Sequence, residues 1–504
     1  MASRTVCSAA PRWTRGFGAE AFGLGGFQLE IALHGTYCSR DSGRPTKARA
    51  GIRRVVGAAH LPLELLQMSR VQGNAWFAAL VLLACATLDP RAAYGRPATP
   101  APPLPPPTGA VVNVSTEAQL QSAVRNIHSN TTIVVAPGTY ALTKSLYFSG
   151  TFADVGIRGA TNNRDDVVLA GPGMTNSSYG NTPYGIWSGG RVQGITIANL
   201  TLRGFYVHPI IFNAGTQSPR VHNVHLIDAG EQFIKSNPDG AGGGVNNGVV
   251  EYSVIEYTSM ARDGYTNGID VHTGANWIIR HNLFRNLQSP RGALAGPAVL
   301  MWNHSTNTLT DGNTFLNCAR GISYGLIVRA GNDHVGGLIR NNVFYRSRTQ
   351  PGDAGIHVAD SPNTQVLNNT VFVSGTYGTP IEYRFTGTTG VVFANNLFDG
   401  AIWARDGAKG RELSNRAGAG EDLFVSAAAG DLHLVATAAS AIDRGVTVSD
   451  VTDDCDGEMR PSGAAYDIGA DEWGAPTASV RIAGYFATRW PARTVLTRAR
   501  STSW

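Results

Sequence analysis

The chain has 504 residues, of which 60 are glycine, 43% are hydrophobic and only 15% are charged. So much glycine with so little charge excludes a coiled coil and a charged disordered polymer, and it favours a turn-rich fold that buries a core. The net charge of +5 belongs to the ends, because residues 1–67 and 475–504 each carry +5 and residues 68–474 carry −5. We therefore do not expect nucleic acid as a partner of the main body.

The first 86 residues predict an exported protein. Residues 1–67 show no sustained period, and we expect them to be non-globular, with the true start at Met68. Residues 68–86 predict a signal peptide, because a basic start precedes an apolar run, 75–84, that is too short to span a bilayer and ends at a small-residue cleavage site. The same run resembles a lipobox, in which Cys85 would carry a lipid anchor. In either case we expect a secreted, periplasmic or outer-surface protein without a transmembrane helix.

Two further segments are expected to flank the folded body. Residues 87–110 are rich in proline and predict an extended linker, and residues 475–504 predict a basic disordered tail. Between these two segments the only cysteines are Cys318 and Cys455, which make neither a zinc motif nor a disulfide framework. The stability of the body must therefore come from packing.

Residues 111–420 contain a repeat. Short runs that alternate apolar and polar residues surround a polar turn, and the turns recur every 24 to 31 residues, at Asn199, Asn223, Tyr252, His281, Gly312, Asn341, Asn368 and Asn395. This spacing, with no helical period beside it, predicts one coil of a β-solenoid per repeat. Coils stack about 4.8 Å apart, so asparagines at one turn position can hydrogen-bond from coil to coil, and we interpret them as structural.

Both ends of the solenoid carry a segment of a different kind. The stretch from Thr116 to His128 predicts a short amphipathic helix, which would cap the first open hydrophobic end, as repeat proteins require. Residues 421–474 are rich in Gly and Asp and are expected to close the other end.

The whole pattern resembles a known superfamily. The run VNVSTEAQLQSAV with TTIVVAPGTY, followed by Asn-rich coils, is similar to the secreted right-handed parallel β-helix proteins, which include polysaccharide lyases, glycoside hydrolases and epimerases. The resemblance implies an all-β, single-stranded, right-handed parallel β-helix with an N-terminal capping helix. It specifies the fold far better than the reaction.

The strand after each polar turn is expected to carry the functional groups. With one isoleucine or valine of each strand placed inward, the outward pairs become Lys235/Asn237, Asp270/His272, Leu300/Trp302, Ser323/Gly325, His357/Ala359 and Glu382/Arg384. On successive coils these residues could line a groove for an extended sugar polymer. We predict substrate binding by Trp302, whose ring would stack on a sugar, and by Asn237, His357, Glu382 and Arg384.

Near Lys235 the sequence is similar to the alginate lyase and chondroitinase B family. In GEQFIKSNP, Lys235 matches the catalytic base of that family, and Glu231 matches a calcium-binding acid. Asn213, in FNAG of the preceding coil, matches a further calcium ligand. The resemblance thus implies a polysaccharide lyase that uses Ca²⁺.

A lyase that acts on an acidic polysaccharide would need three functions. The uronate carboxylate must be neutralised, a base must remove the C5 proton, and an acid must protonate the leaving oxygen. Lys235 or His272 would be the base. Asn213, Glu231 and Asp270 would neutralise the carboxylate or hold the metal, and Arg262, Tyr265 and His304 are candidates for the acid, the first two from the loop 256–268.

Two other functions remain open from the sequence. A glycoside hydrolase needs two carboxylates about 5 to 10 Å apart, which Asp270 could form with Asp263 or Glu256. A non-catalytic surface protein would use the same groove to hold glycan. In each case we expect a monomer.

Overall fold

The computed structural model describes residues 99–373, 375 and 377–474. The expected signal peptide, the Cys85 anchor and the tail after residue 474 lie outside them. Within the described residues, no helix is long and apolar enough to cross a membrane.

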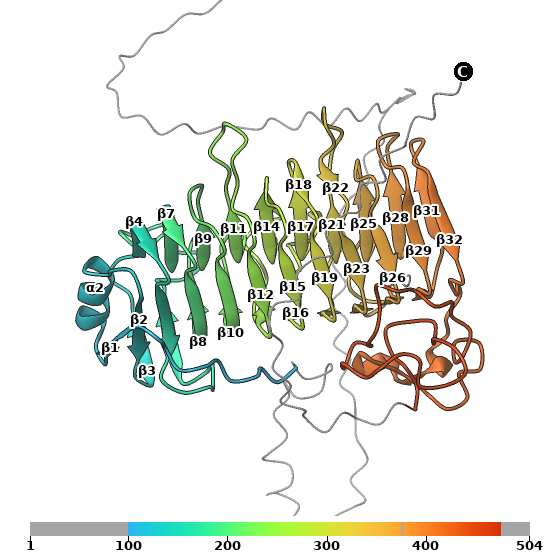
Figure 1. The fold of residues 1–504 in the computed structure, drawn as a ribbon, viewed down its shortest axis with the longest axis horizontal. Helices are drawn as coiled ribbons and strands as arrows, with labels where there is room; N and C mark the ends of the chain where they lie inside the picture. Colours follow the sequence, from blue (N-terminus) through green and yellow to red (C-terminus); the bar gives the residue numbers. More distant parts are fainter. Residues whose placement is uncertain (1–98, 374, 376, 475–504) are drawn as a thin grey trace, which may run out of the picture. The chain divides into compact units, whose positions relative to one another are not determined.

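One side of the coils is a ten-stranded sheet in which every neighbouring pair is parallel. Figure 1 shows these strands in the upper row. They are β4 (Leu146–Ala153), β7 (Ile186–Gln193), β9 (Ile210–Phe212), β11 (Ile234–Ser236), β14 (Ile269–His272), β17 (Val299–Trp302), β21 (Ile322–Tyr324), β25 (Ile356–Ala359), β28 (Ile381–Arg384) and β31 (Ile402–Arg405).

The other side contains twenty strands that also pair in parallel. They form two ladders, before and after the polar turn, which the long strands β8 and β10 join. The first ladder contains β1 (Ala110–Val114), β2 (Thr131–Val135), β5 (Gly156–Gly159), β8 (Thr196–Arg203), β10 (Arg220–Ile227), β12 (Val249–Glu251), β15 (Ile278–Arg280), β19 (Leu309–Asp311), β23 (Leu338–Arg340), β26 (Gln365–Leu367), β29 (Val391–Ala394) and β32 (Gly410–Leu413). The second adds β3 (Gly138–Ala141), β6 (Val167–Ala170), β13 (Val254–Glu256), β16 (Leu283–Arg285), β20 (Thr314–Leu316), β24 (Val343–Tyr345), β27 (Thr370–Phe372) and β30 (Leu397–Phe398). Each coil therefore pairs with the next in parallel, which makes the fold a parallel β-helix.

The polar turns share one backbone conformation. All eight marker positions have φ between 49° and 61°, the left-handed region that asparagine tolerates better than most residues. The residue after the marker forms a buried ladder, in which each side-chain Nδ2 donates to the next Oδ1 over 3.0 Å, through Asn282, Asn313, Asn342, Asn369, Asn396 and Asn415. The structural interpretation of the asparagines is confirmed, and the ladder itself runs through the second position of each pair.

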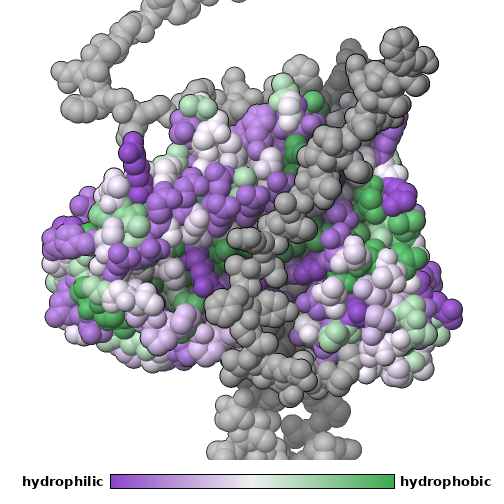
Figure 2. Space-filling view, viewed as in Figure 1, coloured by the Kyte–Doolittle hydropathy of each residue, from purple (hydrophilic) through white to green (hydrophobic). Residues whose placement is uncertain are grey.

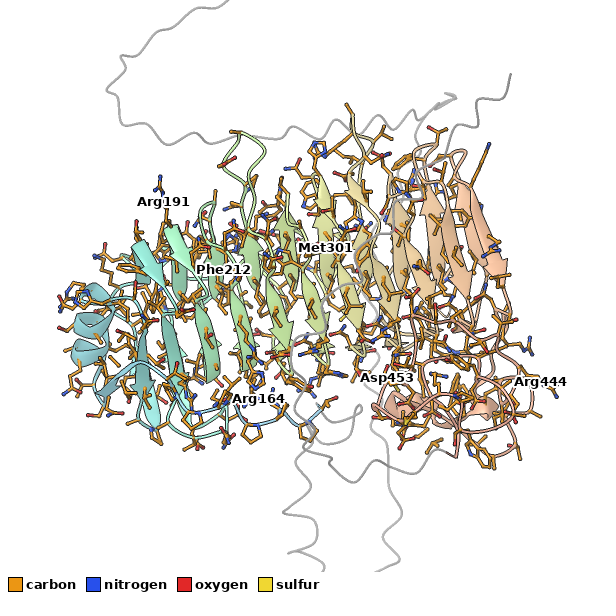
Figure 3. The ribbon with its side chains drawn as sticks, in the orientation of Figure 1. Arg164, Arg191, Phe212, Met301, Arg444 and Asp453 are labelled. Carbon is orange, nitrogen blue, oxygen red and sulfur yellow. The ribbon has the colours of Figure 1, made fainter. Side chains whose placement is uncertain are left out.

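The core lies between the sheets. Inward residues of the ten-stranded sheet stack in register, and Ile234, Ile269 and Ile322 among them are at most 1% exposed. Phe212 and Met301, labelled in Figure 3, are fully buried. Phe rings also stack from coil to coil, at Phe284, Phe315 and Phe344, with centroids 4.8 and 4.4 Å apart.

The predicted capping helix is present as α2 (Glu117–Arg125). The Thr116 hydroxyl caps it by accepting from the backbone N–H of Gln119. Leu120 and Val124 are buried in the main core, so the helix covers the first coil.

The segment 421–474 does not lie where it was expected. It has little regular structure: two short 3₁₀ turns (Glu421–Leu423 and Ala427–Ala429) and the antiparallel pair β33 (Phe424–Ser426) and β34 (Asp431–Leu434). Its backbone carbonyls accept from Asn341, Asn368 and Asn395, the markers of three successive coils. It therefore packs along the side of the last coils, because the marker asparagines there offer donors, and the last strands β31 and β32 stay largely exposed.

Part of the proline-rich segment is also bound and does not act as a free linker. The carbonyl of Pro102 accepts from His222 Nε2, and that of Pro105 accepts from Arg158. An extended proline segment leaves its carbonyls unpaired, so they are available to side chains of the coils.

The remaining pair of strands, β18 (Ser305–Thr306) and β22 (His334–Val335), joins the two loops that follow β17 and β21. Seen from the side of Figure 1, the described surface is largely hydrophilic, with apolar patches near the last coils at the right (Figure 2).

Candidate functional site

The strand registers confirm the predicted outward face of the ten-stranded sheet. Lys235, Asp270, Leu300, Ser323, His357 and Glu382 occupy one register position on neighbouring strands. We call this row, with its continuation through Ile211, Trp187 and Tyr147 at one end and Trp403 at the other, the outward column. The structure divides its polar groups into two clusters.

The first cluster, the lysine cluster, consists of Lys235, Asp270, His272 and Trp302. Lys235 Nζ lies 2.6 Å from Asp270 Oδ2 and 2.9 Å from His272 Nε2. The indole N–H of Trp302 donates to Asp270 Oδ1 over 2.8 Å. Parallel pairing in register brings these residues together from three successive strands.

Asp270 is the electrostatic centre of the lysine cluster. Burial acts to raise its pKa, but the charge and the hydrogen bond of Lys235, together with the nearby His272, outweigh burial, and the net shift is downward. Asp270 is therefore a carboxylate at neutral pH, and the Lys235 ammonium compensates its charge. Lys235 and Asp270 are 7% and 3% exposed, so little of the pair reaches solvent.

His272 is the more accessible titratable group of the cluster. A lysine ammonium has donors only, so His272 Nε2 must accept from Lys235, which places the ring proton of the neutral imidazole on Nδ1. The ring packs on Trp302 with centroids 4.5 Å apart. Trp302 is thus occupied as a hydrogen-bond donor and a packing partner, and the Arg329 guanidinium also lies 5.3 Å from its ring.

A buried histidine that was not among the predicted site residues stands beside the cluster. His208 Nδ1 donates to the carbonyl of Gln232 over 2.9 Å, and Nε2 lies 3.9 Å from Glu231. Burial lowers the pKa of His208 to about 3. The ring is therefore neutral near Lys235 and adds no charge to it.

The two predicted calcium ligands do not form a cation site. Glu231 lies 3.5 Å from the Arg262 guanidinium, which also rests on the Tyr206 ring, and Asn213 Oδ1 accepts from Asn237. Ca²⁺ prefers six to eight oxygen ligands with several carboxylates. In the described part of the chain, the group of three or more His, Cys, Asp or Glu side chains close enough to hold a metal lies elsewhere. A single carboxylate already paired with arginine does not fit Ca²⁺, so we derive no step through this ion.

The second cluster surrounds a cavity of about 140 Å³. Its polar lining combines two carboxylates, three arginines, a histidine and a tyrosine. These are Asp353, Glu382, Arg320, Arg384, Arg405, His357 and Tyr377. Asp270 and Glu382 share the outward column four strands apart, which is about 19 Å at ~4.8 Å per strand. The predicted substrate-binding residues His357, Glu382 and Arg384 therefore lie away from the lysine cluster.

Glu382 is the hub of this cavity. Its carboxylate accepts from Arg405 over 2.9 Å and from the Tyr377 hydroxyl over 3.0 Å, and His357 Nε2 lies 3.8 Å away. Burial and the bond to Glu382 raise the pKa of Tyr377 to about 12, so this hydroxyl stays protonated. Arg384 is held by Asp406, and Arg320 by Asp353.

Some predicted residues lie outside both clusters. Tyr265 is 62% exposed, and its backbone N–H donates to Asp263 within its own loop. His304 Nδ1 donates to the carbonyl of Asn332 on the next coil. The prediction that Glu256 pairs with Asp270 in a hydrolase is wrong. Glu256 belongs to β13 on the other side of the coil, where it pairs with Arg285 and His225.

The aromatic residues at the two ends of the outward column were not among the predicted site residues. The Tyr147 and Trp187 rings lie 5.7 Å apart at one end, and Trp403 is 47% exposed at the other, with Arg405 over its ring. A Cβ at residue 189 would lie 2.3 Å from the indole of Trp187, so Gly189 allows that ring to lie flat on the sheet. Extending the outward alternation by three coils toward the N-terminus and one toward the C-terminus would have identified these rings.

No family model matches this chain, and no curated protein does. Among solved structures, an alginate lyase from Paenibacillus sp. str. FPU-7 is 16% identical over 62% of this chain and 99% of its own, with a TM-score of 0.43. Pectate lyase Pel9A is 15% identical over 72% and 96%, with a TM-score of 0.42. PfbA, a surface adhesin of Streptococcus pneumoniae, is 12% identical over 60% and 86%, with a TM-score of 0.36. The fold rests on the strand registers, and the activities in these names belong to those proteins.

Proposed function

We propose that this protein is an exported enzyme that cleaves a uronate-containing polysaccharide by β-elimination on the outer face of the ten-stranded sheet. The observation that carries the proposal is the lysine cluster, in which a lysine, a buried carboxylate and a histidine meet within hydrogen-bond distance. The clusters and rings of the outward column extend over many coils, which suits a polymer better than a small molecule.

In this mechanism His272 is the base. Once Lys235 turns from His272 Nε2 to the uronate carboxylate, Nε2 removes the C5 proton of the uronate. The bond from C4 to the glycosidic oxygen breaks as the C4–C5 double bond forms, and the leaving oxygen takes a proton from water. An imidazole that is half-buried at the surface suits this step. The ammonium group of Lys235, which is paired with Asp270, would neutralise the uronate carboxylate, and this makes the C5 proton more acidic.

The cavity around Glu382 would hold a distant part of the same polymer. Arg384 and Arg405 can bind carboxylate groups through paired N–H donors, and each is now held by an acidic side chain that a substrate carboxylate could replace. Tyr147 and Trp187 would support sugar rings at the other end of the outward column.

The test is a panel of alginate, pectate and glycosaminoglycans assayed at once for ultraviolet-absorbing unsaturated ends and for reducing ends. We expect unsaturated ends from at least one acidic polymer, and their loss in the His272→Ala variant. His304→Gln is the matched control, because the ring of His304 bonds to the carbonyl of Asn332. Absence of unsaturated product from every uronate polymer would overturn the proposal.

A hydrolase is the second candidate, and the cavity favours it. Asp353 and Glu382 both line the cavity, and glycosidases use two carboxyl groups about 5 to 10 Å apart. Reducing ends without unsaturation, lost in Glu382→Gln and retained in His272→Ala, would select this reaction. Tight binding of a polymer without either product would instead select a glycan-binding protein.

A further inference from the structure

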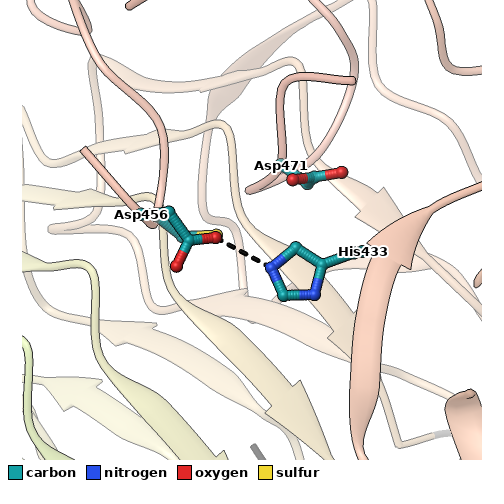
Figure 4. Close-up of side chains that lie close together, drawn as sticks. His433, Asp456 and Asp471 are labelled. Carbon is teal, nitrogen blue, oxygen red and sulfur yellow. Dashed lines mark hydrogen bonds and ion pairs between the residues drawn. The ribbon is translucent and has the colours of Figure 1, made fainter. Parts of the chain in front are cut away.

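A group of metal-ligating side chains lies in the segment 421–474, away from both clusters of the outward column. His433 comes from β34, Cys455 and Asp456 from one loop, and Asp471 from a later stretch (Figure 4). One ligand atom from each of the four lies within 4.8 Å of every other. Cys455 and Asp471 are 2% and 8% exposed. Three stretches of an irregular segment therefore bring a nitrogen, a sulfur and two carboxylates to one point.

The histidine of this group is oriented as in a metal site. Its Nδ1 lies 2.5 Å from Asp431 Oδ1, while Nε2 lies 2.8 Å from Asp456 Oδ2. Metal-bound histidines commonly donate their second ring N–H to a carboxylate, which fixes the ring and strengthens the ligand. Asp431 is placed to serve as this partner, with Nε2 facing the other ligands.

Backbone contacts hold the other ligands in place. Asp454 accepts from the backbone N–H of Asp456 and of Glu458, which fixes the loop. The backbone N–H of Cys455 donates to the carbonyl of Ala470, and Asp471 Oδ2 accepts from the backbone N–H of Leu434. The loop, β34 and the stretch around Asp471 are thus tied to one another before any ion binds.

The local charge also favours a cation. Five carboxyl groups lie around His433 and Arg460, so acidic groups are in excess, namely those of Asp431, Asp454, Asp456, Glu458 and Asp471. A divalent ion would compensate their negative charge.

We propose that His433, Cys455, Asp456 and Asp471 bind one Zn²⁺ ion, which joins the three stretches of the segment 421–474. Four ligands of mixed N, S and O type match the tetrahedral preference of zinc, whereas Ca²⁺ and Mg²⁺ select oxygen alone. Binding removes the proton of the Cys455 thiol, since the thiolate is the ligand. The role is structural, because all four positions of the ion are filled by protein.

The consequence is a metal-dependent stabilisation of the segment itself, which its own contacts hold against the coils. The segment packs a small core against Val343, Phe372 and Leu397, and its loop lies against the marker asparagines. Its own secondary structure is slight, so its order depends on such cross-links.

The experiment uses the full chain after treatment with a chelator and removal of the chelator. Zn²⁺ is titrated while the thermal midpoint is recorded, and Co²⁺ is added separately to detect a thiolate-to-cobalt absorption band. We expect the band and a rise of the midpoint in the wild type. Both should persist in Cys318→Ser, the matched control, because Cys318 is a buried cysteine outside the group. Cys455→Ser should lose the band.

Asp431→Asn tests the orientation of His433 without touching a ligand, and we expect Zn²⁺ affinity to fall 10- to 100-fold. Absence of the cobalt band in the wild type would overturn the proposal, and this measurement needs no variant. An unchanged band in Cys455→Ser would overturn it as well. Neither result depends on the polysaccharide activity.

Discussion

Lys235 and Asp270 form an ion pair of 2.6 Å from neighbouring strands, and each side chain is less than a tenth exposed. Removal of one partner leaves the other charge buried and uncompensated. We expect Lys235→Met to lower the free energy of unfolding by about 3–5 kcal/mol, measured by urea denaturation. The double variant Lys235→Met/Asp270→Asn should recover much of this loss and stay inactive. A single variant as stable as the wild type would show that the pair is already well hydrated.

The His272→Gln variant should separate catalysis from stability. His272 is half-buried at the surface of the sheet, so we expect only a small change in the free energy of unfolding. Loss of a general base should lower kcat by about 10²- to 10⁴-fold, measured from the rate of formation of unsaturated ends. A similar loss in the control His304→Gln would assign the effect to the loop and not to the base.

The aromatic end of the outward column should contribute to polymer binding. We expect Trp187→Ala to weaken binding by about 1 kcal/mol, roughly fivefold in Kd, measured by affinity electrophoresis in polysaccharide gels. Trp473→Ala is the matched control, since Trp473 is 43% exposed on the segment 421–474 and away from the column. Equal effects of the two variants would contradict a specific platform at Trp187.

Two buried histidines should make the fold sensitive to acid. Burial lowers the pKa of His208 and of His334 from 6.5 to about 3, so both are neutral in the folded state. Below pH 6.5 the unfolded chain binds these protons and the folded chain does not, so stability falls as the pH drops toward 3. Each histidine adds a slope of up to about 1.4 kcal/mol per pH unit. Urea denaturation at pH 7 and pH 5 measures it.

The matched variants for this slope are His208→Gln and His304→Gln. The first should reduce the difference in unfolding free energy between pH 7 and pH 5, because it removes one buried titrating ring. The second should leave the difference unchanged, since no buried ring is lost. An equal slope in both variants would show that other groups, such as the buried carboxylates, control the acid limit.

The buried asparagine ladder should carry much of the stability of the coils. Asn342 donates to Asn369 and to the carbonyl of Thr310, and its own Oδ1 accepts from Asn313. We expect Asn342→Ala to lower the free energy of unfolding by about 2–3 kcal/mol, measured in urea, because partners on both neighbouring coils become buried without a bond. Asn276→Ala, an exposed turn asparagine, should cost far less.

The fold was predictable because a solenoid repeats its local rules in every coil. Each marker turn needs a left-handed backbone and each strand alternates in and out, so one coil predicts the next, and the inward isoleucines were placed correctly. The contacts of Lys235, Asp270 and His272 follow from the same register. The segment 421–474 obeys no such repeat, and its position along the side of the coils could not be derived.

The sequence by itself determined a parallel β-helix, its capping helix and which side chains face outward, because period, alternation and turn chemistry are local properties of the chain. Only the tertiary structure decided which of those outward side chains act together. Loop paths and long-range packing separated the lysine cluster from the cavity at Glu382, placed Glu256 on the other side of the coil, and brought His433, Cys455 and Asp471 to one point. Such contacts join residues whose spacing in the chain carries no period, so no pattern in the sequence records them.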